Sequence, residues 1–403
     1  MIRPAEGLSL VLKHARPLKA ARRPLGRSVG CWLAEDVAAD RDMPPADRSA
    51  MDGYAVRSAD IRAPSSSLRL IGEIAAGSAE RPRAGPGTCV RILTGANVPP
   101  GADAVVMLEQ TEERGDSVTI FGPIERGANI LKRREDARKG AVLLRKGTQL
   151  GPLQIAVCAA VGKSLPKVHR PPRISFICTG RELRDVADRV RPHELRNSNG
   201  PGLCAAAAQS GYEVAAYRSA PDDLGRLTTV LRQVARRCNL IALTGGVSVG
   251  RYDYVREAVE RIGARVRFHG VAMKPGKPLL YATLPRNRHI FGLPGNPLSA
   301  MTGFYEFVLP ALRRLAGAGA ERCRPVLRLQ LARQVASKGG RLRFVLARII
   351  WGENGPQVEP VESHSSADLV SGGIADGVIA VPSDVTILRR GAVAEFRPWR
   401  PLP

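Results

Sequence analysis

A glycine-rich turn carries the clearest chemical signal in this chain of 403 residues. It occupies Gly245 to Gly250 and follows Asn239 to Thr244, a short apolar segment long enough for one buried strand. Because an amphipathic stretch comes next, the turn joins a strand to a helix and can offer bare N–H groups to an anion. The spacing matches neither the P-loop nor the dinucleotide fingerprint, so a tight turn without a ligand remains an alternative. The candidate anion-binding residues are Gly245, Gly246, Ser248 and Gly250.

Two rigid turns farther along the chain supply the polar groups that such a site requires. Lys274 and Lys277 flank a Pro-Gly pair. The second turn contains Pro294, Gly295 and Asn296. Cations held on rigid turns stabilise oxyanion charge with little reorganisation. The three turns together predict a phosphate-binding cleft at the carboxyl edge of a parallel sheet.

Acidic side chains are expected to converge on the same edge, because each lies near the end of a predicted strand. Glu182 lies just past the first strand, Asp222 precedes a predicted helix, and Asp253 follows the glycine turn. A carboxylate beside a phosphate is repelled unless it holds a cation, which favours a Mg²⁺ role for Asp253, and we assign Asp222 to the same ion. Helix capping is the alternative role for both. The residues expected beside Glu182 are Thr179 and Gly180.

Three further candidates lie outside this region, in segments rich in turns. Asp52 and Thr94 each precede a glycine at a predicted turn, and Asp136 follows a run of basic residues. The alternatives are an ordinary turn residue for the first two and a solvated loop for Asp136. The six histidines form no metalloprotease motif and pair with no Ser or Cys nucleophile, so triad chemistry is not expected.

The glycine turn belongs to a region in which predicted strands and helices alternate. Such alternation is typical of a parallel sheet covered on both faces, so we expect an α/β domain. The expected elements, in chain order, are Ile174–Cys178, Gly202–Ser210, Glu213–Tyr217, Leu224–Arg236, Leu240–Leu243, Tyr254–Ile262, Val266–Phe268, Leu279–Thr283, His289–Leu293 and Leu298–Leu315.

The rest of the chain predicts three more domains, so the expected fold is multidomain α/β plus β. The N-terminal domain should have helices over residues 5–18 and 150–161 and a strand over 28–37. Short β-like runs between Gly and Pro turns predict a small inserted β domain, and the C-terminal region suits a small barrel or sandwich. The predicted boundaries are 1–42 with 128–170 for the helical and extended N-terminal domain, 43–127 for the inserted β domain, 171–320 for the α/β domain and 321–403 for the C-terminal β domain.

Composition narrows the class of protein further. The net charge of +24 invites a nucleic-acid partner, but aromatic residues are only 4% and basic residues are spread along the chain, so binding to small anions is favoured. No run reaches the roughly 18 apolar residues of a membrane helix, and no signal pattern opens the chain. The seven cysteines are scattered without a C-x-x-C pair, and we expect a cytoplasmic protein in which Cys158, Cys178, Cys204 and Cys238 are core thiols.

Taken together, these segments resemble the molybdopterin molybdenumtransferases, a family that includes MoeA-type proteins and the gephyrin E domain. They occur in family order from about residue 5 to residue 316, with a weaker match in the C-terminal region. The α/β region alone is less specific, because molybdopterin adenylyltransferases and CinA-type proteins share it. The matching sequences are SAMDGYAV, RILTGANVPPGADAVV, Glu135-Asp136 with Lys-Gly after it, CTGREL, LTGGVSVGRYDY, VAMKPGKP and GLPGNPLSA.

The resemblance implies insertion of molybdate into adenylylated molybdopterin, with release of AMP and with Mg²⁺. It implies an elongated homodimer of four-domain subunits and an α/β domain that binds molybdopterin. The implied cleft lies between the α/β domain of one subunit and the β insert of the other. Molybdopterin adenylyltransferase and molybdoenzymes are further partners to consider. The residues that match family functional positions are Asp52, Thr94, Asp136, Glu182, Asp222, Asp253 and Lys274.

Several positions near the anion site depart from the family pattern, which shifts charge without removing the core motifs. Two readings therefore stand beside the insertase. One is a protein that binds or delivers molybdopterin or its molybdenum cofactor without turnover, and the other is an adenylyl-transferring paralogue. The departures are Arg181 and Asn197 in place of acids, Gly270 and Leu131 in place of basic residues, Arg134 in place of glycine and Leu346 in place of arginine.

Overall fold

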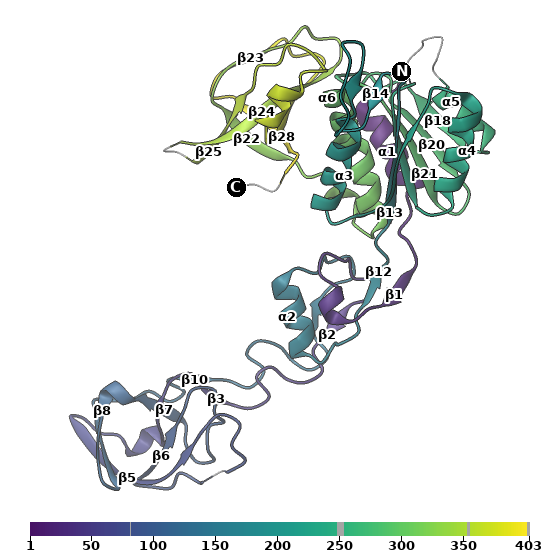
Figure 1. The fold of residues 1–403 in the computed structure, drawn as a ribbon. Coiled ribbons are helices and arrows are strands. Elements are labelled where there is room, and N and C mark those ends of the chain that lie inside the picture. The colour runs from purple at the N-terminus through teal and green to yellow at the C-terminus, as the bar shows by residue number, and fades with distance from the viewer. Residues whose placement is uncertain (81, 248–253, 353–354, 401–403) are drawn as a thin grey trace. The chain divides into compact units, whose positions relative to one another are not determined.

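A computed structural model describes residues 1–80, 82–247, 254–352 and 355–400. These residues belong to two compact units (Figure 1). No helix within the described ranges is both long and apolar enough to cross a membrane. The predicted site residues Ser248, Gly250 and Asp253 lie outside the described residues. The first unit comprises Met1–Ala34, Gly147–Gly151 and Lys167–Pro403, and the second comprises Glu35–Lys146 and Pro152–Pro166.

A six-stranded sheet in the order β16-β13-β17-β21-β20-β18 forms the centre of the first unit. The first four strands are parallel, as predicted, whereas β20 runs antiparallel to β21 and β18 antiparallel to β20. A tight hairpin explains the reversal, because Arg286 and Asn287 both have positive φ angles and join β20 directly to β21. The strands are β13 (Arg173–Thr179), β16 (Glu213–Ala220), β17 (Leu240–Thr244), β18 (Arg265–His269), β20 (Leu280–Leu284) and β21 (Arg288–Leu293).

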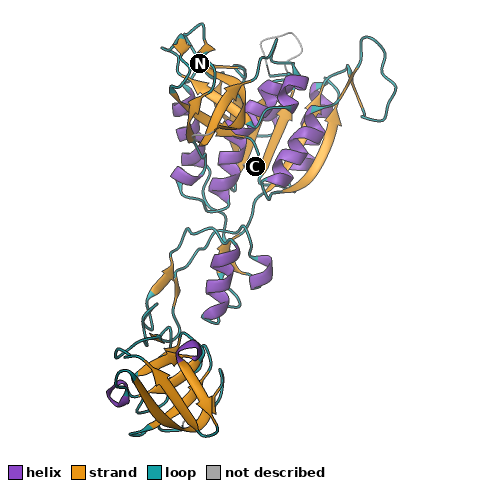
Figure 2. Cartoon of the chain, turned by 90° about the vertical axis from the view of Figure 1, so that its left-hand side faces the viewer, coloured by secondary structure: helices purple, strands orange, loops and turns teal. Residues whose placement is uncertain are grey.

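Helices cover both faces of this sheet, which confirms the predicted α/β architecture (Figure 2). Alternate side chains of β13 enter the two cores, since Phe176 packs with one and Ile177 with the other. The first core contains α1 (Pro4–His14), α3 (Asn199–Gln209), α6 (Pro297–Gly303), the π-helical segment η4 (Phe304–Val308) and α7 (Leu309–Leu315). The second core contains α4 (Leu224–Ala235) and α5 (Val255–Arg261).

The C-terminal region of the first unit is a closed barrel of five strands, one of the two expected architectures. β24 pairs with both β25 and β26, and β22 and β28 complete the circle. Closure leaves these strands without free edges. The barrel strands are β22 (Leu327–Leu331), β24 (Leu342–Gly352), β25 (Gly355–Pro360), β26 (Gly377–Val381) and β28 (Val393–Pro398). Smaller elements nearby are β19 (Met273–Lys274), β23 (Val335–Ala336), α8 (Leu369–Gly373) and β27 (Ile387–Leu388).

The second unit contains a six-stranded sheet in the order β7-β4-β6-β5-β9-β8, in the segment where the β insert was predicted. Two clusters of buried apolar side chains form its cores. The sheet strands are β4 (Gly53–Val56), β5 (Ser65–Ile74), β6 (Thr88–Ile92), β7 (Ala104–Met107), β8 (Thr111–Arg114) and β9 (Ser117–Phe121). The other elements are β2 (Val37–Ala38), β3 (Arg48–Ser49), β10 (Ile130–Leu131), β11 (Val142–Leu144) and α2 (Pro152–Ala160).

The strand predicted over residues 28–37 is wrong for most of its length. Gly30 has a φ of +76°, so the chain turns there instead of remaining extended. Trp32 and Leu33 are buried, but each makes only an isolated bridge. Their burial explains the misleading apolar pattern. The remaining short strands are β1 (Ala20–Arg22), β12 (Lys167–His169), β14 (Leu183–Arg184) and β15 (Leu195–Arg196).

Candidate active site

A cavity of about 730 Å³ lies at the carboxyl ends of β13, β17 and β21, where the phosphate-binding cleft was predicted. We call it the strand-end cavity. Segments far apart in the sequence meet in its wall because parallel strands end at one edge of a sheet. The predicted site residues that line it are Thr179, Gly180, Glu182, Asp222, Gly245, Gly246, Pro294, Gly295 and Asn296.

Main chain packed closely at glycines forms the floor of this cavity. Gly245 has a φ of +87°, and a Cβ atom there would lie 2.4 Å from the carbonyl oxygen of Thr179. Its N–H donates to the Leu293 carbonyl at 3.1 Å, so this one residue contacts the ends of two neighbouring strands. Gly246 also has a positive φ. Only glycine combines this conformation with such a close approach, which explains the glycine pair.

Two carboxylates stand at the cavity wall. Glu182 is exposed, and Asp222 accepts a hydrogen bond from the Arg181 backbone N–H at 3.2 Å. No cluster of three acidic, His or Cys side chains occurs in the part of the chain that the structure describes. Mg²⁺ typically takes one or two carboxylates and keeps several waters, so this donor set fits that ion without a complete protein cage.

A polar side of the cavity was not identified as a binding surface from the sequence. Asn197, where the family resemblance led us to expect an acid, is only 2% exposed. Its amide donates to the Tyr217 hydroxyl at 2.8 Å, and its Oδ1 accepts from the Gly200 N–H at 3.1 Å. The nearby Asn199 amide donates to the Gly295 carbonyl at 2.6 Å. The Asn-Ser-Asn sequence of residues 197–199 could have indicated this side of the cavity. These three side chains are uncharged.

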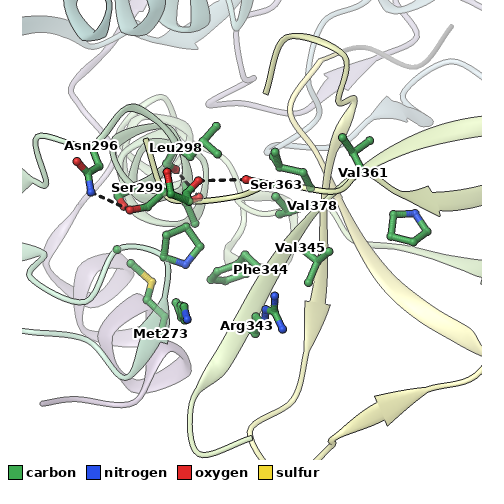
Figure 3. Close-up of a pocket in the computed structure, with 18 of the residues that line it drawn as sticks. Met273, Asn296, Leu298, Ser299, Arg343, Phe344, Val345, Val361, Ser363 and Val378 are labelled. Carbon is green, nitrogen blue, oxygen red and sulfur yellow. Dashed lines mark hydrogen bonds between the residues drawn. The ribbon is translucent and has the colours of Figure 1, made fainter. Parts of the chain in front are cut away.

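A second depression, of about 930 Å³, lies between the α/β region and the barrel (Figure 3). We call it the basic groove. It shares three lining residues with the strand-end cavity, namely Pro278, Pro294 and Asn296. Lys274 and Lys277 line this groove and not the cavity, so the structure separates them from the glycine turn with which they were grouped.

Arginines of the barrel make the groove more cationic than the sequence motifs indicated. Arg333, Arg341 and Arg343 line it together with the two lysines, and Glu362 is the one acid among the described lining residues. Arg333 is also ion-paired with Glu359 at 3.1 Å, which offsets part of its charge. Figure 3 shows Ser299 on the α/β side and Arg343 on the barrel side. The signal that could have revealed the arginines is the Arg-Leu-Arg sequence directly before Phe344.

The arginine missing from position 346 is therefore not replaced by the nearby Arg348. Leu346 is 5% exposed and lines the groove, whereas Arg348 is not among the lining residues and pairs with Glu359 at 2.7 Å. Arg343, on the same strand, supplies a groove cation instead. On the α/β side, the Asn296 amide donates to the Ser366 hydroxyl at 2.7 Å, which joins the shared wall to the barrel region.

In the second unit, the structure brings together two candidates that lie far apart in the sequence. The Asp52 carboxylate accepts from the Thr94 N–H at 2.6 Å and from the Thr94 hydroxyl at 2.7 Å. These hydrogen bonds, chiefly the one from the backbone, lower the pKa of the Asp52 carboxyl. Asp136 lies on a different turn, where its N–H donates to the Met43 carbonyl at 3.0 Å. All three side chains are exposed.

Comparison with known families covers nearly the whole chain. Residues 2–162 match the MoeA N-terminal region (domain I and II). Residues 175–314 match a probable molybdopterin binding domain. Residues 328–399 match the MoeA C-terminal region (domain IV).

Individual relatives agree with this assignment. A molybdopterin molybdenumtransferase of Staphylococcus aureus (strain COL) is 36% identical over 381 residues, covering 94% of this chain and 90% of the relative. A molybdopterin molybdenumtransferase of Staphylococcus epidermidis is 34% identical over 395 residues, covering 97% and 94%. The crystal structure of a molybdopterin biosynthesis moeA protein from Pyrococcus horikoshii matches with a TM-score of 0.83 and 28% identity, covering 99% of this chain and all of that one.

Proposed function

This chain belongs to the MoeA family of molybdopterin molybdenumtransferases, and we propose that it inserts molybdate into adenylylated molybdopterin and releases AMP. It is thus a transferase of molybdenum cofactor biosynthesis. The observation that carries the proposal is the junction of two anion-binding surfaces. A glycine-floored cavity and a cation-lined groove share Pro278, Pro294 and Asn296.

The strand-end cavity would hold the phosphate-bearing part of the pterin nucleotide. Gly245 and Gly246 expose main chain at the carboxyl ends of parallel strands, where phosphates bind in α/β sheets. Glu182 and Asp222 stand at the wall of the same cavity, where they can act on water near the phosphoanhydride that is broken when AMP leaves.

The basic groove would hold molybdate as the second substrate. Its cations come from rigid positions, with Lys274 and Lys277 beside the Pro-Gly turn and Arg343 on a barrel strand. Several hydroxyls also line the groove, including that of Ser299. Fixed cations and donors stabilise an oxyanion with little reorganisation. Because the two depressions share a wall, an oxyanion in the groove would stand next to a pterin in the cavity.

We assign Mg²⁺ to Asp222 and Asp253, of which only Asp222 lies in the described residues. When bound, the ion would neutralise phosphoanhydride oxygens. Asp52, Thr94 and Asp136 are the further catalytic residues that we propose from the second unit. The proposed assembly is a homodimer. We propose a cytoplasmic location, because all seven cysteines are free and thiols stay reduced in that compartment. A molybdopterin adenylyltransferase and molybdoenzymes are the proposed partners.

The decisive experiment is a turnover assay on the purified full-length chain. The protein is incubated with adenylylated molybdopterin and Mg²⁺, with and without molybdate, and AMP is followed by chromatography. We expect AMP release that depends on molybdate and that is accompanied by active molybdenum cofactor. Light scattering on the same sample should report a dimer.

Other outcomes separate the competing readings. Tight binding of the pterin without AMP release would contradict the insertase and favour a binding or delivery protein. Formation of adenylylated pterin from ATP and molybdopterin would favour the adenylyl-transferring paralogue. Asp222→Asn tests the assigned acid, because loss of the carboxylate should slow AMP release while the pterin still binds.

A further inference from the structure

Asp136 lies on a turn formed by residues 132–139, and main-chain hydrogen bonds hold it in place. The N–H groups of Asp136 and Ala137 donate to the Met43 carbonyl at 3.0 and 3.1 Å, and the Met43 N–H donates back to Ala137 at 2.8 Å. The Asp136 side chain is exposed and has no polar partner among the described residues. Its position therefore depends on whatever holds the turn.

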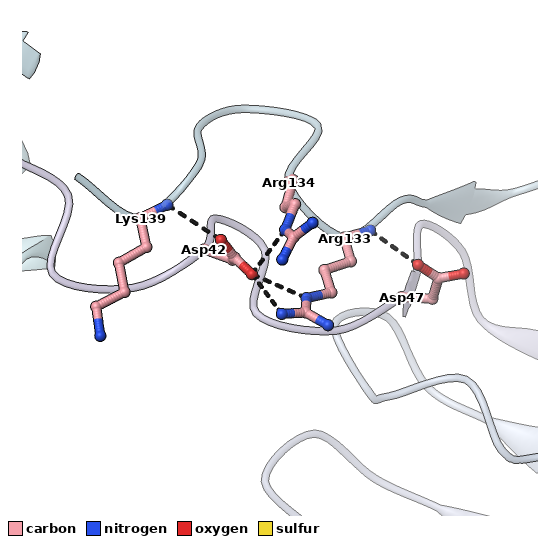
Figure 4. A network of polar contacts seen from close by, with 5 residues as sticks. All are labelled: Asp42, Asp47, Arg133, Arg134 and Lys139. Carbon is pink, nitrogen blue, oxygen red and sulfur yellow. Dashed lines mark hydrogen bonds and ion pairs between the residues drawn. The ribbon is translucent and has the colours of Figure 1, made fainter. Parts of the chain in front are cut away.

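Asp42 is the side chain that holds this turn most extensively (Figure 4). Its Oδ1 accepts from the Lys139 N–H at 3.0 Å, near the end of the turn. Its Oδ2 accepts from the guanidinium of Arg133 at 2.6 and 2.9 Å and from Nε of Arg134 at 2.9 Å. The Asp42 side chain is 11% exposed, and the Lys139 N–H and the two arginines hold the pKa of its carboxyl well below its usual range.

Arg134 explains why the turn requires such an anchor. Its φ is +70°, a left-handed conformation that side chains other than glycine rarely adopt. Glycine would adopt this conformation without steric cost. Here the guanidinium of Arg134 binds Asp42, and this contact stabilises the unfavourable backbone.

Asp47 makes a weaker, local contact with the same turn. Its Oδ1 accepts from the Arg133 N–H at 2.8 Å, and its Oδ2 lies 3.3 Å from the Lys132 ammonium. These contacts involve only the first residues of the turn, and both side chains of the ion pair are about half exposed. Within the described residues, Asp42 is the side chain that links the two arginines to the backbone at position 139.

We propose that Asp42 is a positioning residue for the reaction, because it fixes the main chain that presents Asp136. The inference rests on the proposed function, in which Asp136 takes part in molybdate insertion. The hydrogen bonds of the Asp42 carboxylate go to Arg133, Arg134 and Lys139 of the turn. Its contribution is transmitted chiefly through Arg134, the residue with the left-handed backbone, and only secondarily through Arg133 and the Lys139 N–H.

Asp42→Asn tests this role directly. An asparagine can still accept from the Lys139 N–H, but it loses the charge that binds two guanidiniums. We expect kcat for AMP release to fall roughly ten- to a hundred-fold, as for a misplaced catalytic group, with little change in KM. Amides of residues 132–139 should exchange faster with deuterium, whereas the Thr94 amide should not. Asp40→Asn is the charge-matched control, because exposed Asp40 lies outside the network and should behave as wild type.

A rescue separates positioning from general destabilisation. Arg134→Gly supplies the residue that suits a φ of +70° and should by itself leave AMP release within a few-fold of wild type. In the Asp42→Asn background it should recover most of the lost rate, because the turn no longer needs the guanidinium contact. Asp47→Asn should lose less activity than Asp42→Asn, since its Oδ1 can still accept from Arg133.

The outcomes that overturn the proposal are distinct from a failure of the proposed function. Normal AMP release by Asp42→Asn, while Asp136→Asn is slow, would refute positioning by Asp42 and leave the insertase intact. A loss that Arg134→Gly does not restore would also refute it. Normal release by Asp136→Asn would remove Asp136 from the reaction and overturn this inference with it.

Discussion

The strand-end cavity and the basic groove share a wall, but each offers a different kind of chemical group to a bound anion. The cavity has a main-chain floor, with Gly245 and Gly246 between strand ends and the acids Glu182 and Asp222 at its edge. The groove instead presents cationic side chains. They are Lys274, Lys277, Arg333, Arg341 and Arg343.

The difference implies a division of labour between the two depressions. Backbone N–H groups hold a phosphate in a fixed geometry, and the Mg²⁺ proposed at Asp222 would offset the repulsion from the neighbouring carboxylates. Full positive charges suit a small, free oxyanion, whose capture depends on attraction. The described lining of the cavity has two acids against one cation, Arg196, so it would bind molybdate poorly, and the groove has little to orient a pterin. Substitutions in the two depressions should therefore affect different substrates.

The largest effect is expected from Gly245→Ala in the cavity. The new Cβ atom would meet the Thr179 carbonyl at 2.4 Å in a residue whose φ is +87°, so the strand ends must separate. We expect AMP release to fall at least about a hundred-fold, since displacements near 1 Å at a reacting centre cost that much. Pterin binding should weaken in calorimetry while molybdate binding persists.

Gly295→Ala provides the matched control in the same cavity. Gly295 has no positive φ, and a Cβ atom there would lie 3.7 Å from the Gly245 Cα, an ordinary contact. The variant should retain most of its activity. Equal losses in the two variants would show that any added methyl group closes the cavity, and the argument from the backbone of Gly245 would fail.

The next effect concerns how the stability of the sheet strands below the cavity changes as the pH falls. His289 on β21 is 1% exposed, with its ring 3.0 Å from the Tyr281 hydroxyl and 3.1 Å from the Asn287 side chain. Burial lowers the pKa of His289 to about 4, from 6.5. Its folded pKa is depressed, so the unfolded chain takes up the proton first. Stability is therefore full above the unfolded pKa and is lost as the pH falls from 6.5 toward 4.

Between about pH 7 and pH 5 this one group should remove about 2 kcal/mol from the free energy of unfolding. Urea-dependent hydrogen exchange of β13, β17 and β21 would measure the loss. His289→Gln cannot be protonated in this range and should flatten the pH dependence, whereas His193→Gln, at an exposed histidine, should not.

The cavity was predictable from the sequence because its determinants are local. Strand ends, glycine pairs and acids just past a strand can be read along the chain, and a parallel sheet brings them to one edge. Thr179, Asp222 and Gly245 therefore meet as expected. The antiparallel edge was missed because it depends on a hairpin at Arg286 and Asn287, whose positive φ angles no hydrophobic pattern reveals.

The groove was not predictable in the same way, because it forms where the barrel packs against the α/β region, and Phe344, Leu346 and Val378 share a core cluster with that region. Lys274 was grouped with the glycine turn for its motif, but the pairing of β19 with β24 places it beside Arg343. Nothing in the local sequence fixes that pairing. The same limit applies to Asp42 and Arg134, whose contact joins residues far apart in the chain.

The smallest of these effects is expected from Arg343→Met, which tests the groove side of the comparison. Methionine keeps much of the side-chain length but removes one of five groove cations, and loss of one charge-assisted contact costs about 1.5 kcal/mol or slightly more. We therefore expect the KM for molybdate to rise about tenfold while pterin binding is unchanged.

Arg348→Met, on the same strand but paired with Glu359 outside the groove, should leave the KM for molybdate at its normal value. The rise should shrink at high ionic strength, because salt already screens the attraction in the wild-type groove. If Arg343→Met instead weakened the pterin and spared molybdate, the two depressions would not divide the substrates as their linings indicate.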